Sequence, residues 1–121
     1  MGDLTANFSR SEFACRCGCG ADDINMALVE TLQEVRDAYG KPIVITCGVR
    51  CQGLNATVSK YPIHPDGNGA DIEMPKDGEA RHHLLCLLMG EFDRVGIYDR
   101  HIHVDIDERY KQPWLWLGKS G

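Results

Sequence analysis

Apolar residues recur at every third or fourth position over residues 24–39, which is the spacing of one helix face. Residues 22–23 are both aspartate and are expected to cap the start of this helix, and Gly40 is expected to cap its end. A second helix is expected over residues 78–91, with Asp77 as its N-cap. The pattern therefore predicts two helices separated by about forty residues of other structure.

Four short apolar stretches predict strands, over residues 43–46, 70–74, 95–98 and 102–106. A tight turn at residues 99–100 is expected to join the last two. Residues 52–69 show little periodicity and predict a long loop, and loops of this length are usually functional. The expected fold class is α+β. We expect a single domain over residues 1–121, with a small, mostly antiparallel sheet and helices packed on one face.

Polar side chains share one face of two predicted strands. Because strand side chains alternate with period two, His103 lies on the same face as His101 and Asp105, opposite the apolar residues. In the strand over 70–74, Asp71 also points away from its apolar neighbours. If these strands are neighbours, Asp71 and His103 approach each other on an exposed face.

The end of the predicted loop supplies a further polar residue, His64. Gly67 and Gly69 would let this loop fold back tightly, because glycine tolerates backbone angles closed to other residues. Two histidines and an aspartate can bind a zinc ion on three sides and leave the fourth position open to water. The pattern therefore predicts a catalytic Zn²⁺ site formed by His64, Asp71 and His103, although each residue alone is typical of an ordinary surface side chain.

The formal net charge of −5 argues against a nucleic-acid partner. No apolar run approaches the roughly 20 residues that cross a bilayer, so no membrane partner is expected. The N-terminal residues carry no signal-peptide pattern, and synthesis in the cytoplasm is expected. We expect a monomer.

Six cysteines are many for such a chain. Cys86 lies in an apolar run and is expected to be a small buried hydrophobic residue. Three interpretations stay open for the others: reduced thiols, disulfides, which a cytoplasmic compartment disfavours, or a structural metal site without the usual spaced pairs. These residues are Cys15, Cys17, Cys19, Cys47 and Cys51. In a further alternative, the Cys-rich start is the only metal site.

Several segments together resemble a known family. Residues 8–20 are similar to the start of many small phage-encoded members, and residues 45–50 to the strand and arginine before the loop. Residues 64–72 resemble the first metal-binding segment at its ligand spacing, and residues 103–106 resemble the second. The family is that of zinc D-Ala-D-Ala carboxypeptidases and phage endolysin peptidases, which share a fold with the hedgehog signalling domain.

The resemblance implies that His64, Asp71 and His103 are the zinc ligands. It also implies that Arg50 holds the carboxylate of the substrate or polarises its carbonyl, a role that suits the planar guanidinium fork. The implied activity is hydrolysis of an amide bond in peptidoglycan stem peptides, by a carboxypeptidase or an endolysin-type endopeptidase. The alternative is a catalytically silent zinc domain that binds cell wall or a protein. A phage-derived protein would act on the cell wall.

The chain departs from this family at two positions. Pro62 stands where a serine is usual, and Arg100 stands where better-studied carboxypeptidases carry an acid, three residues before the last histidine ligand. The general base therefore stays open among His101, Asp105 and Asp99. We favour Asp105 as a base or as a residue that orients a ligand, and His101 as a group that stabilises the oxyanion.

Overall fold

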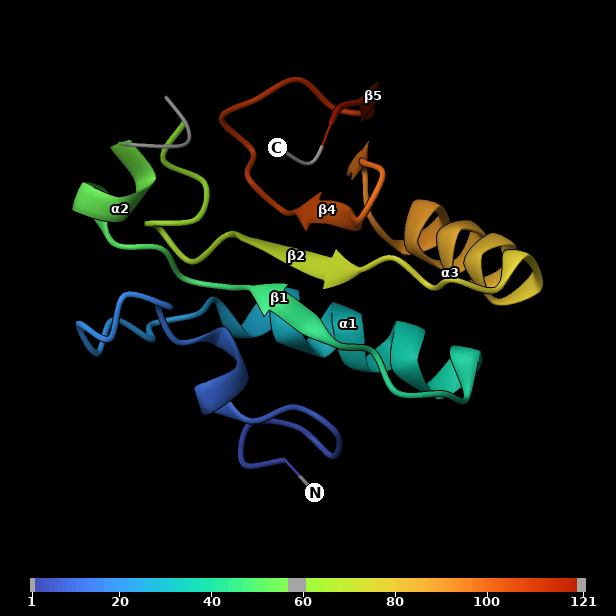
Figure 1. Ribbon diagram of the computed structural model, residues 1–121, viewed down its shortest axis with the longest axis horizontal. Helices are drawn as coiled ribbons and strands as arrows, with labels where there is room; N and C mark the ends of the chain where they lie inside the picture. Colours follow the sequence, from blue (N-terminus) through green and yellow to red (C-terminus); the bar gives the residue numbers. More distant parts are fainter. Residues whose placement is uncertain (1, 57–60, 120–121) are drawn as a thin grey trace.

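The computed structural model describes residues 2–56 and 61–119 and has the predicted α+β fold (Figure 1). The helical elements are η1 (Arg10–Phe13), α1 (Met26–Tyr39), α2 (Gln52–Ala56) and α3 (Gly78–Glu91). The strands are β1 (Ile45–Cys47), β2 (Gly69–Glu73), β3 (Arg94–Ile97), β4 (His101–Asp105) and β5 (Trp114–Leu117). Among the described residues, no helix is both long and apolar enough to cross a membrane.

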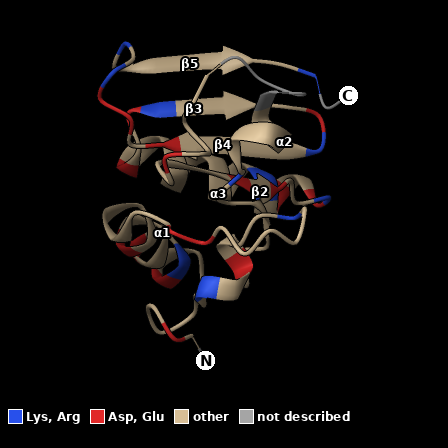
Figure 2. Cartoon of the chain, turned by 90° about the vertical axis from the view of Figure 1, so that its left-hand side faces the viewer, with Lys and Arg blue, Asp and Glu red and all other residues tan. Residues whose placement is uncertain are grey.

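The five strands form one sheet in the order β1-β2-β4-β3-β5. Figure 2 shows β5, β3, β4 and β2 in this order from the top of the view. All neighbouring pairs are antiparallel except β3 and β5, which are parallel. The prediction of a small, mostly antiparallel sheet is confirmed, but β5 was not predicted, because its Trp-Leu-Trp-Leu sequence has no alternation of apolar and polar residues.

The two long helices begin and end at capping residues. The start of α1 is capped by Asn25, whose side chain accepts a hydrogen bond from the Ala27 backbone N–H at 2.9 Å, and not by the aspartates predicted at residues 22–23. Gly40 ends α1 in the left-handed conformation, with φ of 75°, as predicted. The predicted cap of α3 is also confirmed, because the Asp77 side chain accepts a hydrogen bond from the Ala80 backbone N–H at 2.9 Å.

The helices α1 and α3 cover one face of the sheet, and the hydrophobic core lies between these helices and the sheet. Its most buried members come from both helices and from the three inner strands: Leu28, Leu32, Val35, Leu84, Leu88, Ile72, Val95, Ile102 and Val104. The apolar residues of β2 and β4 that were predicted to face the core do so. The opposite face of these strands is therefore left for polar side chains.

Three local expectations were wrong. Cys86 is exposed rather than buried, because α3 packs through Leu84 and Leu88 and a residue between them falls on the far side of the helix. The first strand, β1, spans Ile45–Cys47 and not the predicted residues 43–46. The predicted loop over residues 52–69 contains α2, while residues 57–60 lie outside the described part of the chain.

The N-terminal segment lies along the outer edge of β1. The Arg16 guanidinium donates to the backbone carbonyls of Ile45 and Thr46, at 2.9 and 3.3 Å. The Val49 backbone N–H donates to the Phe13 carbonyl at 2.7 Å, just beyond the end of β1. These contacts cover a sheet edge that would otherwise expose unpaired backbone groups, and they bring the cysteine-rich turn close to the connection between β1 and α2.

Candidate metal centre

The polar face of the sheet places Asp71 opposite His103. The two residues are direct partners in the antiparallel register of β2 and β4, so the condition under which they were expected to approach each other is met. The Nδ1 atom of His103 lies 3.0 Å from Oδ1 of Asp71. The face is not exposed as expected, because His103 is only 7% accessible and its ring packs against Trp116, with ring centroids 5.3 Å apart.

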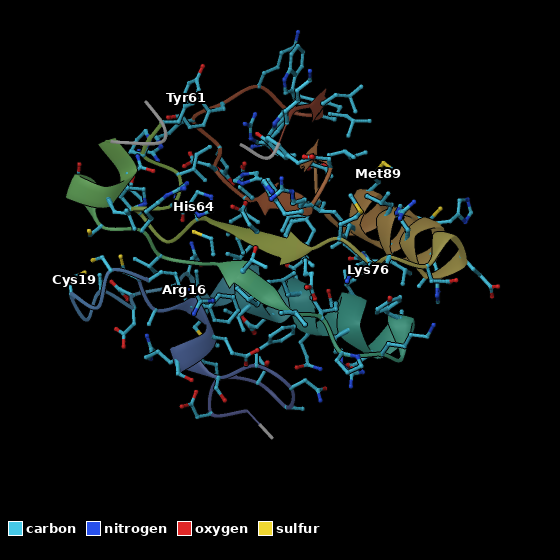
Figure 3. All side chains as sticks on the ribbon, viewed as in Figure 1. Arg16, Cys19, Tyr61, His64, Lys76 and Met89 are labelled. Carbon is cyan, nitrogen blue, oxygen red and sulfur yellow. The ribbon has the colours of Figure 1, made fainter. Side chains whose placement is uncertain are left out.

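His64 reaches the same carboxylate from the loop before β2. Its Nε2 atom lies 3.5 Å from Oδ1 of Asp71, and its ring centroid lies 5.1 Å from that of His103. Figure 3 shows His64 beside the end of β2 at which the strand begins. The structure therefore brings together all three residues that were predicted to bind zinc.

Two glycines shape the approach of this loop, for different reasons. Gly67 has φ of 73°, a left-handed conformation that residues with a Cβ rarely adopt, as the prediction required. Gly69 is not among the glycines with positive φ, so the expectation of unusual backbone angles was wrong there. It provides space instead, because a Cβ on Gly69 would lie 2.6 Å from Cγ2 of Ile63 and 3.1 Å from Cε1 of His103.

Hydrogen bonds behind both imidazoles determine which nitrogen faces Asp71. The Nδ1–H of His64 donates to the Gly48 carbonyl at 2.8 Å, so Nε2 is directed toward Asp71. The Nε2–H of His103 donates to Oδ2 of Asp105 at 2.7 Å, so Nδ1 is directed toward Asp71. Metal-binding histidines usually donate their second N–H in this way, which fixes the tautomer and the ring orientation. The donor set and its orientation fit a zinc ion.

Asp105 lies behind His103 and not beside the cleft. Its side chain is fully buried, and Oδ1 accepts a hydrogen bond from Nε of Arg94 at 2.8 Å. The same oxygen accepts from the Asp107 backbone N–H at 3.1 Å. Both carboxylate oxygens are therefore engaged by neighbouring groups of the protein.

Proximity to carboxylates shifts the ionisation of the two histidines. Burial lowers the pKa of His103, but its hydrogen bonds with Asp105 and Asp71 outweigh this effect and raise it above the usual value. The pKa of His64 is raised for the same reason, by Asp71 and Cys47 against burial. Burial alone would raise the pKa of Asp71, yet the two histidines hold it well below its usual range.

His101 is the third histidine at this site. Its Nε2 atom lies 3.9 Å from Oδ2 of Asp71, and its ring stacks on Tyr98 at a centroid distance of 4.2 Å. Burial lowers the pKa of His101, which favours a neutral ring. Its side chain is 24% accessible, so His101 is open to the cleft in a way that the other two histidines are not.

A cleft of about 830 Å³ opens beside these side chains. Arg50 lines it, and Nε of Arg50 is buried with no hydrogen-bond partner among the described residues, so this donor is available to a ligand. The remaining lining is mostly aromatic or basic: Tyr61, Tyr98, Tyr110, Trp114, Trp116, Arg94, Lys111 and Lys119. A chain of net charge −5 thus has a cleft in which basic side chains outnumber acidic ones.

Sequence reasoning missed Arg94 and Cys47. Arg94 pairs with Asp105 across the β3–β4 hairpin, and the predicted turn at residues 99–100 would have placed the two opposite each other. The Sγ atom of Cys47 lies 3.8 Å from Nδ1 of His64. Cys47, His64 and Asp71 have potential ligand atoms within 4.8 Å of one another, so a thiol also lies within reach of this centre.

Comparison with known proteins agrees with this geometry. No curated protein sequence matches the chain. A family model described as Peptidase M15 matches residues 6–107, a span that contains His64, Asp71 and His103. This family comprises zinc-dependent peptidases related to D-Ala-D-Ala carboxypeptidases. Since the match covers most of the chain, the protein belongs to the peptidase M15 family.

Proposed function

We propose that this protein is a zinc peptidase that hydrolyses an amide bond in peptidoglycan stem peptides. The observation that carries the proposal is the convergence of two oriented imidazoles, from His64 and His103, on the carboxylate of Asp71. Three nitrogen and oxygen ligands with an open fourth position are typical of catalytic zinc sites, whereas structural sites are closed by four protein ligands. Zinc bound there would polarise the substrate carbonyl and make a water molecule more acidic.

Asp105 acts in this proposal as a positioning residue and not as the general base. It holds Nε2–H of His103, is itself held by Arg94, and does not line the cleft. A carboxylate in this position orients a ligand and increases its basicity. It has no direct path to a substrate proton.

His101 is the group that we assign to proton transfer. It lines the cleft 3.9 Å from Oδ2 of Asp71, and the stacked ring of Tyr98 keeps the imidazole beside the metal centre. An imidazole in this place can take a proton from the attacking water and return it to the leaving amine. It thereby replaces the acid that is absent at Arg100.

Arg50 is proposed to bind the substrate. Its buried Nε lacks a partner among the described residues, and a guanidinium can hold a carboxylate through two parallel hydrogen bonds. Lys111 and Lys119 add positive charge along the same cleft. Stem peptides carry free carboxylates, and these basic side chains would favour them over neutral peptides.

The test is incubation of the zinc-loaded protein with purified peptidoglycan, followed by mass spectrometry of the soluble products. Free D-Ala would identify a carboxypeptidase, and cleaved stem peptides would identify an endopeptidase. His103→Ala should abolish either product, whereas His82→Ala, a change of the same type at an exposed position on α3, should not. Zinc-loaded protein that binds the wall and releases no product would refute the proposed peptidase activity. It would favour a catalytically silent binding domain, an alternative that is also consistent with an arginine in place of the acid at position 100.

A further inference from the structure

Four cysteines gather at the end of the molecule where α2 begins. Cys15, Cys17 and Cys19 come from the turn after η1, and Cys51 directly precedes α2. Their Sγ atoms all lie within 4.8 Å of one another, and all four are free thiols. Figure 3 shows sulfur atoms beside the labelled Cys19. None of the four lines that cleft.

The spacing of the sulfur atoms is that of a tetrahedral metal site. The Sγ atoms of Cys15 and Cys17 are 3.4 Å apart, and those of Cys17 and Cys51 are 3.6 Å apart. In a tetrahedral zinc site with Zn–S bonds of about 2.3 Å, neighbouring sulfur atoms lie about 3.8 Å apart. These two pairs are about 0.2–0.4 Å closer than that, so a bound ion would need the sulfur atoms to move only slightly apart.

The backbone around the cluster is arranged to support a thiolate. The Cys51 backbone N–H donates to Sγ of Cys15 at 3.3 Å, which links the N-terminal turn to the start of α2. Within the turn, the Cys15 N–H donates to the Ala21 carbonyl at 2.7 Å and the Gly18 N–H donates to the Cys15 carbonyl at 3.3 Å. These bonds close the turn that carries the three cysteines.

We propose that Cys15, Cys17, Cys19 and Cys51 bind a second zinc ion with a structural role. Four thiolates close the coordination sphere, as in structural zinc sites, and leave no position for water or substrate. Thiolates are also the soft ligands that favour zinc over magnesium or calcium. Each thiol releases its proton to solvent on binding, and no redox step is needed.

The position of Cys51 gives this ion a consequence for the cleft. Arg50 is its neighbour, and the carbonyl of Gly48, which orients His64, lies in the same connection between β1 and α2. A zinc ion would fasten this connection to the N-terminal segment, so it would hold Arg50 in place. The site itself does not depend on the proposed peptidase activity.

The test uses the full chain, reduced, freed of metal and titrated with Co²⁺ under anaerobic conditions. We expect a second cobalt ion per chain beyond the one at His64, Asp71 and His103, with intense thiolate-to-cobalt charge-transfer absorption in the near ultraviolet. Cys19→Ser should lower this absorption by at least about a quarter, because one of the four thiolates is lost, and Cys19 is exposed, so the variant should fold. Cys86→Ser, the same change on α3, should leave it unaltered.

The outcomes separate the two centres. His103→Ala should remove one cobalt ion and retain the charge-transfer absorption, which shows that the thiol site is independent of the peptidase site. A single cobalt ion per chain without this absorption in the unaltered protein would overturn the proposal. Disulfides among the four cysteines in protein purified under reducing conditions, detected by mass spectrometry, would also overturn it.

Discussion

Asp105→Asn tests how the buried ion pair orients His103, one of the three proposed zinc ligands. In the protein, one carboxylate accepts from Nε2–H of His103 at 2.7 Å and from Nε of Arg94 at 2.8 Å. An asparagine has the same shape but only one accepting oxygen, and its amide N–H groups would face one of these two donors. Either His103 loses its fixed tautomer or Arg94 loses its acceptor.

The expected magnitudes follow from the burial of the pair. Loss of the group behind a metal-binding histidine weakens metal binding by about 10- to 100-fold. Removal of one partner from a buried ion pair destabilises a protein by about 3–5 kcal/mol. Since the Arg94 guanidinium also donates to the Lys111 carbonyl at 2.8 Å and packs on Tyr110, we expect the lower end of that range.

Two measurements check this prediction. Competition with a chromogenic zinc chelator gives the affinity, and urea unfolding of the metal-free protein gives the stability. The matched control is Asp37→Asn, the same change at an exposed position on α1, where both quantities should stay within about 0.5 kcal/mol of the original. Zinc affinity unchanged within a factor of about two in Asp105→Asn would refute the reasoning, because His103 would then not depend on Asp105.

Three further predictions concern space, protons and substrate. Gly69→Ala should destabilise the protein by about 1–3 kcal/mol in urea unfolding, because the new methyl group meets Ile63 and His103, whereas Gly53→Ala, in open space, should not. Zinc affinity in the chelator assay should fall with decreasing pH, and the fall should begin above the usual histidine pKa of about 6.5. A protonated imidazole cannot bind a metal, and both proposed histidine ligands have a raised pKa. The loss of zinc affinity should therefore approach about 100-fold per pH unit once both are protonated. A pH-independent affinity would contradict this prediction. Arg50→Lys should lower kcat/KM on stem peptides by about 10- to 100-fold with unchanged zinc content, and an unchanged kcat/KM would exclude Arg50 from substrate binding.

The sequence predicted the elements whose signals are local. Alternation along β2 and β4 was enough to place Asp71 and His103 on the polar face, because a strand has a strict period of two, whereas the pairing of these strands was an assumption that the structure bears out. The cap of α1 was missed, since three nearby residues are suited to the role. Asn25 takes it because its backbone N–H also donates to the Gly67 carbonyl at 2.9 Å, a contact with a distant loop.

The missing features depend on contacts between distant segments. β5 forms by parallel pairing with β3, and its exposed Trp114 and Leu117 give no signal of a sheet edge. The same strand brings Trp116 over His103, so the polar face became a buried wall of the cleft instead of an open surface. The convergence of His64, Asp71 and His103 was therefore predictable, whereas the burial that fixes their ionisation and orientation was not.

Anomalous diffraction at the zinc edge, from crystals of the zinc-loaded protein, tests the central claim most directly. We expect a peak about 2.0–2.2 Å from Nε2 of His64, Nδ1 of His103 and a carboxylate oxygen of Asp71, with the fourth position held by a small exchangeable ligand. Crystals of fully loaded protein without a peak among these three side chains, or with zinc on Nε2 of His103, would contradict the account.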